Sequence, residues 1–305
     1  MEDKKRPYSK ERRPGRPFAD RPKSFATRPR KESGAKPAGA KPMGTKPAGT
    51  RPPRPKAATR KAPAEDSPVR LNKYIANAGI CSRREADTLI ETGQITVNGV
   101  QVTELGTKVN PLKDDIRFNG TRIKGEKKVY LVMNKPKGFV TTLSDPHAEQ
   151  TVMDLISKNL CPQRVYPVGR LDKATTGVLL LTNDGDLSEK LTHPSHQVRK
   201  VYQAQLDRNL AKEDFDKLLG GIELEDGPIA ADALSYVDGD KSQIGLEIHS
   251  GRNRIVRRMF EHLGYKVKKL DRVYFAGLTK KKLRRGNWRF LEEKEINLLK
   301  MGAFE

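Results

Sequence analysis

The sequence predicts an α+β protein with three parts: a disordered basic tail, a small module of two helices and two hairpins, and a larger domain. Its composition changes sharply near residue 68. Two helical patterns and two Asn-Gly turns follow that change directly. Beyond residue 128, strand and helix patterns interleave without a regular βαβ rhythm, which favours a mixed, largely antiparallel sheet with flanking helices. We therefore expect a tail (1–68), a module (69–117), a linker (118–128) and a larger domain (129–305).

The tail holds much of the positive charge. The chain carries 60 Lys and Arg against 38 Asp and Glu, a net charge of +22, and residues 1–68 account for 20 of the former and 7 of the latter. The same segment has 13 of the 20 prolines and three aromatic residues, too few apolar groups to offset the entropy of ordering. We expect it to be disordered, either as a solvated linker or as a tether for phosphates. The charge as a whole predicts an acidic partner, most simply nucleic acid.

Several classes of protein are disfavoured by what the sequence lacks. No stretch approaches the ~18 apolar residues of a membrane helix, and the charged, Pro-rich start does not resemble a secretory signal. Two cysteines, Cys81 and Cys161, are too few for a disulfide scaffold or a four-thiolate zinc site. Neither an HExxH pair nor a phosphate-binding glycine loop occurs. We therefore expect a cytoplasmic protein with no metal, no nucleotide cofactor and no membrane contact.

The module begins with two short helices. The first carries Leu71, Ile75 and Ala78 on one apolar face, and it ends at Gly79. Ser82 and Glu85 form a capping-box pattern at the start of the second helix, which Gly93 ends. The hairpins follow, at turns Asn98-Gly99 and Asn119-Gly120, because Asn-Gly strongly favours the type I′ turn.

Four cations lie at the starts of these helices: Arg70, Lys73, Arg83 and Arg84. Positive charge is unfavourable at a helix N-terminus, unless a phosphate binds there; an ordinary solvated face is the alternative. The run Val69-Arg-Leu-Asn-Lys-Tyr-Ile-Ala-Asn-Ala-Gly-Ile-Cys-Ser-Arg-Arg-Glu-Ala-Asp, followed by Gly93-Gln-Ile-Thr-Val-Asn-Gly99, resembles an S4 RNA-binding domain. The resemblance covers 69–117 and implies that these cations contact RNA.

The larger domain contains one strongly amphipathic helix, predicted over 255–263. Its apolar side carries Ile255, Val256, Met259, Phe260 and Leu263, and its opposite side carries Arg254, Arg257 and Arg258. A solvated basic face would explain the arginines. However, like charges at this spacing repel each other, whereas an anionic partner would make the same spacing favourable.

Asp172 is the candidate for catalysis. It lies between Arg170 and Lys173, just before the buried strand that starts at Gly177. An aspartate in such a loop is most often a turn residue. A carboxylate in a basic pocket without metal ligands would instead suggest nucleophilic catalysis.

The larger domain resembles the RsuA/RluB-type pseudouridine synthases. The resemblance rests on four motifs in the family's order: Asn134-Lys135-Pro136-Lys137-Gly138, Gly169-Arg170-Leu171-Asp172, Arg199-Lys200-Val201-Tyr202 and Gly251-Arg252-Asn253-Arg254-Ile255-Val256-Arg257-Arg258-Met259. It implies that Asp172 is the catalytic aspartate, that Tyr202 stacks on the target base and that Arg257 pairs with the aspartate. The expected supports of the active site are Lys135, Pro136, Gly169, Arg170 and Leu171, and Arg252, Arg254 and Arg258 are expected to bind RNA. Ile255 departs from the family, in which many members have Gln.

The resemblance implies isomerisation of a uridine to pseudouridine in ribosomal RNA, with preference for the large subunit, by a monomer that needs no cofactor. Asp172 would act as nucleophile or as base on the sugar; both remain open. Two alternatives are a non-catalytic RNA-binding or ribosome-assembly factor and a carboxylate-dependent nuclease or glycosidase. The last would need a second carboxylate, for which the sequence offers Asp184 and Asp186.

Overall fold

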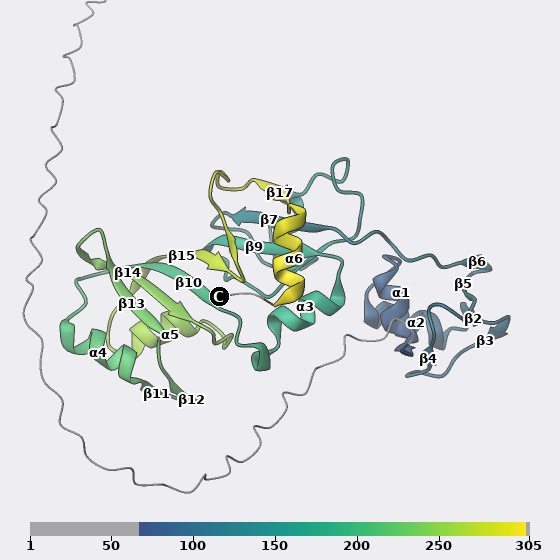
Figure 1. Cartoon of the computed structure of the whole chain (residues 1–305), viewed down its shortest axis with the longest axis horizontal. Helices are drawn as coiled ribbons and strands as arrows, with labels where there is room; N and C mark the ends of the chain where they lie inside the picture. Colours follow the sequence, from purple (N-terminus) through teal and green to yellow (C-terminus); the bar gives the residue numbers. More distant parts are fainter. Residues whose placement is uncertain (1–66, 303–305) are drawn as a thin grey trace, which may run out of the picture. The chain divides into compact units, whose positions relative to one another are not determined.

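The computed structural model describes residues 67–302. The predicted disordered tail therefore lies almost entirely outside the described residues. The described chain forms a small N-terminal module followed by a larger domain built on one extended sheet (Figure 1). No helix within 67–302 combines the length and the apolar character that crossing a membrane requires.

The N-terminal module packs two helices against short strands. Its helices are α1 (Leu71–Asn77) and α2 (Arg83–Glu91). Its strands are β1 (Val69–Arg70), β2 (Ile95–Val97), β3 (Val100–Gln101), β4 (Lys108–Val109), β5 (Ile116–Phe118) and β6 (Thr121–Arg122). Strands β3, β2, β5 and β6 form an antiparallel sheet in that order, while β1 pairs with β4. One apolar core, which includes Leu71, Ile75 and Ile90, joins both helices to the strands.

The local signals in this module are confirmed. Ser82 caps α2: its hydroxyl accepts from the Glu85 N–H at 3.2 Å, and the Glu85 carboxylate accepts from the Ser82 N–H at 2.6 Å. Both Asn-Gly turns have positive φ at the two central residues, as a type I′ turn requires. The expected end of the module at residue 117 falls inside the β5–β6 hairpin. Ile123 belongs to the same core, so the packed module continues to this residue.

The larger domain contains a mixed sheet in the order β13-β14-β10-β15-β9-β7-β17. Its strands are β7 (Tyr130–Lys135), β8 (Tyr166–Pro167), β9 (Thr176–Thr182), β10 (Lys200–Leu206), β13 (Ala233–Val237), β14 (Asp240–Ile248), β15 (Val267–Phe275), β16 (Leu278–Thr279) and β17 (Trp288–Phe290). The β15–β9 pair is parallel and the other pairs are antiparallel, as the sequence predicts. A separate hairpin joins β11 (Ile222–Leu224) to β12 (Gly227–Ile229).

Helices cover the two halves of this sheet separately. α4 (Lys212–Gly220) and α5 (Ile255–His262) pack with β10, β14 and β15 around one core, whereas α3 (Gly185–Thr192) and α6 (Glu293–Met301) pack with β7 and β9 around another (Figure 1). Two 3₁₀ turns, Val152–Leu155 and Pro194–His196, complete the domain. The central strands β10, β15 and β9 therefore run where the two halves meet.

Close contact between β9 and β15 depends on a glycine. Gly177 lies opposite Arg272 in the parallel pair and has a φ of +113°. A Cβ at this position would lie 2.1 Å from the Arg272 carbonyl oxygen and 2.6 Å from its nitrogen. Only glycine lets the two strands approach this closely, and this approach joins the halves of the sheet.

Candidate active site

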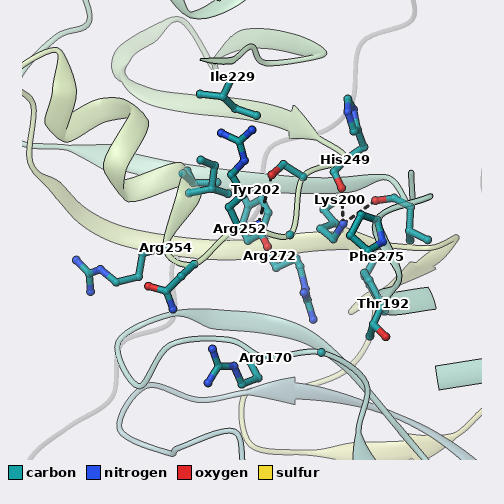
Figure 2. A pocket seen from close by; sticks show the side chains of 18 of the residues that line it. Arg170, Thr192, Lys200, Tyr202, Ile229, His249, Arg252, Arg254, Arg272 and Phe275 are labelled. Atoms are coloured by element: carbon teal, nitrogen blue, oxygen red, sulfur yellow. Dashed lines mark hydrogen bonds between the residues drawn. The ribbon is translucent and has the colours of Figure 1, made fainter. Parts of the chain in front are cut away.

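A cavity of about 1000 Å³ opens where the two halves of the sheet meet. The loop before β9, the strands β10 and β15 and the start of α5 line it. The sequence-predicted residues that it brings together are Gly169, Arg170, Leu171, Asp172, Tyr202, Arg252 and Arg254. In Figure 2, Arg170 before β9, Arg252 and Arg254 before α5, and Arg272 on β15 surround the cavity, with Tyr202 among them. Its polar lining is therefore dominated by positive charge.

Buried hydrogen bonds fix the loop that carries Asp172. The ammonium of Lys135, fully buried at the end of β7, donates to the carbonyl oxygens of Asp172 at 3.1 Å and Thr175 at 2.9 Å. It also donates to the Pro136 carbonyl at 3.2 Å. Thr141 donates its hydroxyl to the Leu171 carbonyl at 2.7 Å. Burial lowers the pKa of Lys135 to about 8, and the nearby Asp172 opposes this effect. The backbone of Asp172 is thus held while its side chain, 31% exposed, reaches the cavity.

Arg257 is the cation beside Asp172. Its Nε lies 3.8 Å from the Asp172 Oδ2, and its Nη1 donates to the Val267 carbonyl at 2.9 Å. Nε is buried and has no hydrogen-bond partner, so its donor capacity is unused. Burial and then the charge of Arg254 lower the pKa of Arg257, while Asp172 and Glu261 oppose that shift. This arrangement provides a positive group at the point where negative charge would gather on Asp172.

The surroundings of Arg257 and Arg258 correct the simple division of α5 into apolar and basic sides. The helix starts at Ile255 and its apolar residues are buried as expected, but Arg257 is buried too, at 7% exposure. A helix projection considers one helix by itself, so it places Arg257 on the polar side. The projection omits the Val267 carbonyl of β15, which accepts a hydrogen bond from Arg257. Arg258 instead binds Asp226 through two hydrogen bonds of 2.9 and 2.6 Å.

The remaining expected RNA contacts have different surroundings. Arg70, Arg83 and Arg84 are exposed at the starts of α1 and α2, with Arg70 as the N-cap of α1. Lys73 forms an ion pair with Asp186 at 2.5 Å. Arg252 donates to the Gly227 carbonyl at 2.9 Å. Of the expected contacts, Arg70, Arg83, Arg84 and Arg254 therefore present the most exposed charge.

Sequence reasoning missed three side chains of the cavity. Lys200 lies two residues before Tyr202. Because side chains alternate between the faces of a strand, this spacing could have predicted that both residues lie on the same face of β10. Arg272 comes from β15, and nothing in the sequence reveals that this strand lies beside β10. His249 also lines the cavity and contacts Asp232 at 2.8 Å.

The second carboxylate in the cavity is not one of the two that the sequence suggested as a partner for Asp172. Asp184 caps α3 and binds Lys128 and Tyr130, and neither it nor Asp186 lines the cavity. Asp232 does line it, but it contacts His249. Among residues 67–302, no group of three or more His, Cys, Asp or Glu side chains is placed to hold a metal ion.

Comparisons with known proteins agree with this architecture. Residues 69–116 match the S4 domain, and residues 129–262 match the RNA pseudouridylate synthase family. The chain is 44% identical over 235 residues to the ribosomal large subunit pseudouridine synthase B of Bacillus subtilis, covering 76% of this chain and 95% of that protein. It is 36% identical to the dual-specificity RNA pseudouridine synthase RluF of Escherichia coli, covering 77% and 80% respectively.

A solved structure agrees as well. The crystal structure of a pseudouridylate synthase superimposes with a TM-score of 0.54 and 29% identity, covering 76% of this chain and 99% of that one. The extent of these matches, over both the S4 module and the domain with the cavity, leaves one conclusion. This chain is an enzyme of the RNA pseudouridine synthase family, with an S4 RNA-binding domain ahead of a domain of the family that isomerises uridine to pseudouridine in RNA.

Proposed function

We propose that this enzyme isomerises a specific uridine of large-subunit ribosomal RNA, with Asp172 as its catalytic residue. The observation that carries the proposal is the Asp172 carboxylate in the cavity, with Arg257 at 3.8 Å and Tyr202 on the same wall. The choice of large-subunit RNA rests on the relative from Bacillus subtilis, whose name specifies that substrate. We further propose that the enzyme works in the cytoplasm as a monomer and without a nucleotide cofactor.

The target base must leave the RNA stack, because a stacked base cannot reach a carboxylate inside a cavity. Tyr202 offers an aromatic face for the extruded uracil, and stacking of this kind is worth about 1–3 kcal/mol per base. Unstacking costs a few kcal/mol, so this contact offsets much of it. Arg252 and Arg254, which line the cavity, would contact phosphates of the surrounding RNA.

Asp172 then acts on the sugar, either by attack at C1′ or by removal of a sugar proton. The C1′–N1 bond breaks, the uracil turns, and C5 forms the new bond to C1′. C5 loses its proton and N1 gains one, so the product has the same composition as the substrate. Arg257 stabilises the negative charge that shifts between carboxylate and uracil. No oxidation or hydrolysis occurs.

The first prediction tests the carboxylate. Asp172→Asn retains the shape of the side chain but removes its charge, so we expect no pseudouridine in ribosomal RNA transcripts. RNA affinity should change by only about a few-fold, because phosphate contacts dominate binding. Pseudouridine mapping after incubation, with binding measured in parallel, provides both readouts.

Asp216→Asn is the matched control, because Asp216 is an exposed aspartate of α4 that pairs with Lys212. This variant should modify RNA like the wild type. Substantial turnover by Asp172→Asn would exclude Asp172 from catalysis. Modification confined to small-subunit RNA would contradict the proposed substrate while leaving the role of Asp172 intact.

A further inference from the structure

One wall of the cavity carries two positive side chains that the proposed mechanism does not use. Lys200 on β10 and Arg272 on β15 both line the cavity, close to Tyr202 (Figure 2). Arg272 is only 2% exposed. Its Nε donates to the Val178 carbonyl at 2.8 Å, but its buried Nη2 has no hydrogen-bond partner. Lys200 donates to the carbonyls of Val198 and His249, each at 2.8 Å, which leaves one of its three hydrogens free.

Strand geometry brings these cations to the same face. Lys200 and Tyr202 share a face of β10 because side chains alternate along a strand. Their partners on β15 are Phe275 and Arg272, and the register shifts between Val201 and Tyr202. This bulge puts Arg272 and Phe275 on the same side, with the guanidinium carbon of Arg272 4.5 Å from the centre of the Phe275 ring.

The nearest carboxylate in sequence cannot neutralise Arg272. Asp271 points to the other face of β15, where it pairs with Lys280 and Arg285 and accepts from the Thr176 hydroxyl at 3.0 Å. Within the described residues, neither Lys200 nor Arg272 forms an ion pair. The carboxylates of the cavity have other partners, since Asp172 faces Arg257 and Asp232 contacts His249.

This arrangement is electrostatically unfavourable without a ligand. Burial and then the charge of Arg272 lower the pKa of Lys200 to about 8, although Asp232 opposes the shift. A buried charge without an ion-pair partner, such as that of Arg272, destabilises a protein, and repulsion from the half-buried Lys200 adds to this effect. An anion between them would remove the repulsion and take up the unused N–H groups of both.

We infer that Lys200 and Arg272 form a phosphate site that binds a backbone phosphate next to the flipped uridine. This inference rests on the proposed function, because the uridine must enter the same cavity. RNA brings one phosphate per nucleotide, and the planar guanidinium of Arg272 and the point charge of Lys200 both suit phosphate oxygens. The site would fix the sugar while the base turns, and this would position C1′ against Asp172.

The test compares ligands that differ only in phosphate. The full-length protein is titrated calorimetrically, at fixed ionic strength, with uridine, uridine 5′-monophosphate, uridine 3′-monophosphate and inorganic phosphate. We expect one of the two monophosphates to bind at least about tenfold more tightly than uridine, because hydrogen bonds between charged groups are the strong ones. In Lys200→Met and in Arg272→Met, that preference should fall to about threefold or less, while uridine binds as before.

Lys269→Met is the matched control. Lys269 is an exposed cation on β15 outside the cavity, so this variant loses one charge from the same strand and should keep the preference. If Arg272→Met does not fold, Arg272→Lys and Lys200→Met provide the comparison. An equal loss of uridine and monophosphate binding would mean a contact to the base or a structural role, and would overturn the inference.

Other outcomes separate this inference from the proposed function. Equal affinity of the wild type for uridine and both monophosphates would overturn the phosphate site, even if ribosomal RNA is modified. Inorganic phosphate that binds as tightly as the preferred monophosphate would also overturn it, because the site would then serve a free anion. A phosphate preference that Lys200→Met abolishes, in a protein that forms no pseudouridine, would support the site and refute the proposed function.

Discussion

At the scale of single residues, the cations in and near the cavity differ in what neutralises them. Arg257 lies beside Asp172, Arg258 is bound by Asp226, and Arg272 has no carboxylate partner within the described chain. Adjacent arginines of α5 therefore have different surroundings, although they look equivalent in the sequence. Their variants should separate in the same way.

The comparison of Arg257→Leu with Arg258→Leu is the second prediction. We expect Arg257→Leu to lower the rate of pseudouridine formation by about 10²–10³-fold, the usual effect of removing one group that stabilises developing charge. Arg258→Leu should lower it only a few-fold, because an exposed ion pair contributes about 0–1 kcal/mol. Single-turnover rates on the same RNA measure both. Equal, small effects would indicate that α5 only binds phosphates.

Lys135 supports the third prediction, on the pH dependence of stability. Its folded-state pKa of about 8 lies below the usual 10.5 of the unfolded chain. Between these values the unfolded state binds more protons, so the contribution of Lys135 to stability rises with pH. From about pH 7.5 to about pH 9.5, the free energy of unfolding of the wild type should rise by about 1–2 kcal/mol relative to Lys135→Met. Urea unfolding at both pH values measures this difference, and a difference that does not change with pH would contradict it.

At the scale of elements, local signals could be predicted from the sequence and long-range ones could not. The capping box of α2 and the two Asn-Gly hairpins depend on residues within four positions of each other, and all three are confirmed. The buried face of α5 was also predicted. The position of Arg257, by contrast, depends on a carbonyl of β15, and the order of the strands decides where that carbonyl lies.

Gly177→Ala is the fourth prediction and tests the contact between β9 and β15. The new Cβ would meet Arg272 backbone atoms at 2.1 and 2.6 Å, so the strands must separate. We expect a loss of stability of about 2–4 kcal/mol, from the strained φ and the steric overlap together. Gly138→Ala is the control, because Gly138 has a φ of +98° but no atom within 4 Å of the new Cβ. Similar losses in both variants would mean that backbone strain alone explains the effect.

At the scale of the whole molecule, residues 1–68 and the rest of the chain both carry a net positive charge. Residues 1–68 carry 20 basic groups, and they were expected to bind phosphates without selecting a sequence. The S4 module has packed helices and exposed arginines at the starts of them. The domain with the cavity has cores of its own. The S4 module was readable from its motifs, but its extent to Ile123 needed the packing of its core.

The fifth prediction separates these contributions by truncation. Removing residues 1–68 takes away 20 cations but keeps Val69, which pairs with Val109 in β1–β4. RNA binding should weaken and its salt dependence should become less steep, because each phosphate contact contributes about 0.9 to the slope of log K against log salt on duplex nucleic acid. The same uridine should still be modified, because contacts to phosphates position RNA but carry no sequence information.

Removing residues 1–123 takes away the whole S4 module, including the core that ends at Ile123. This variant should also lose selection of the target on structured RNA, because a module with fixed helix ends recognises RNA shape. Binding as a function of salt and pseudouridine mapping are measured for both truncations, with circular dichroism as the check on folding. The shorter truncation would contradict the tether if it moved the modified position or left the salt slope unchanged. Unchanged site selection by a folded 124–305 fragment would mean that the cavity alone selects the uridine, with the cations around it as the recognition surface.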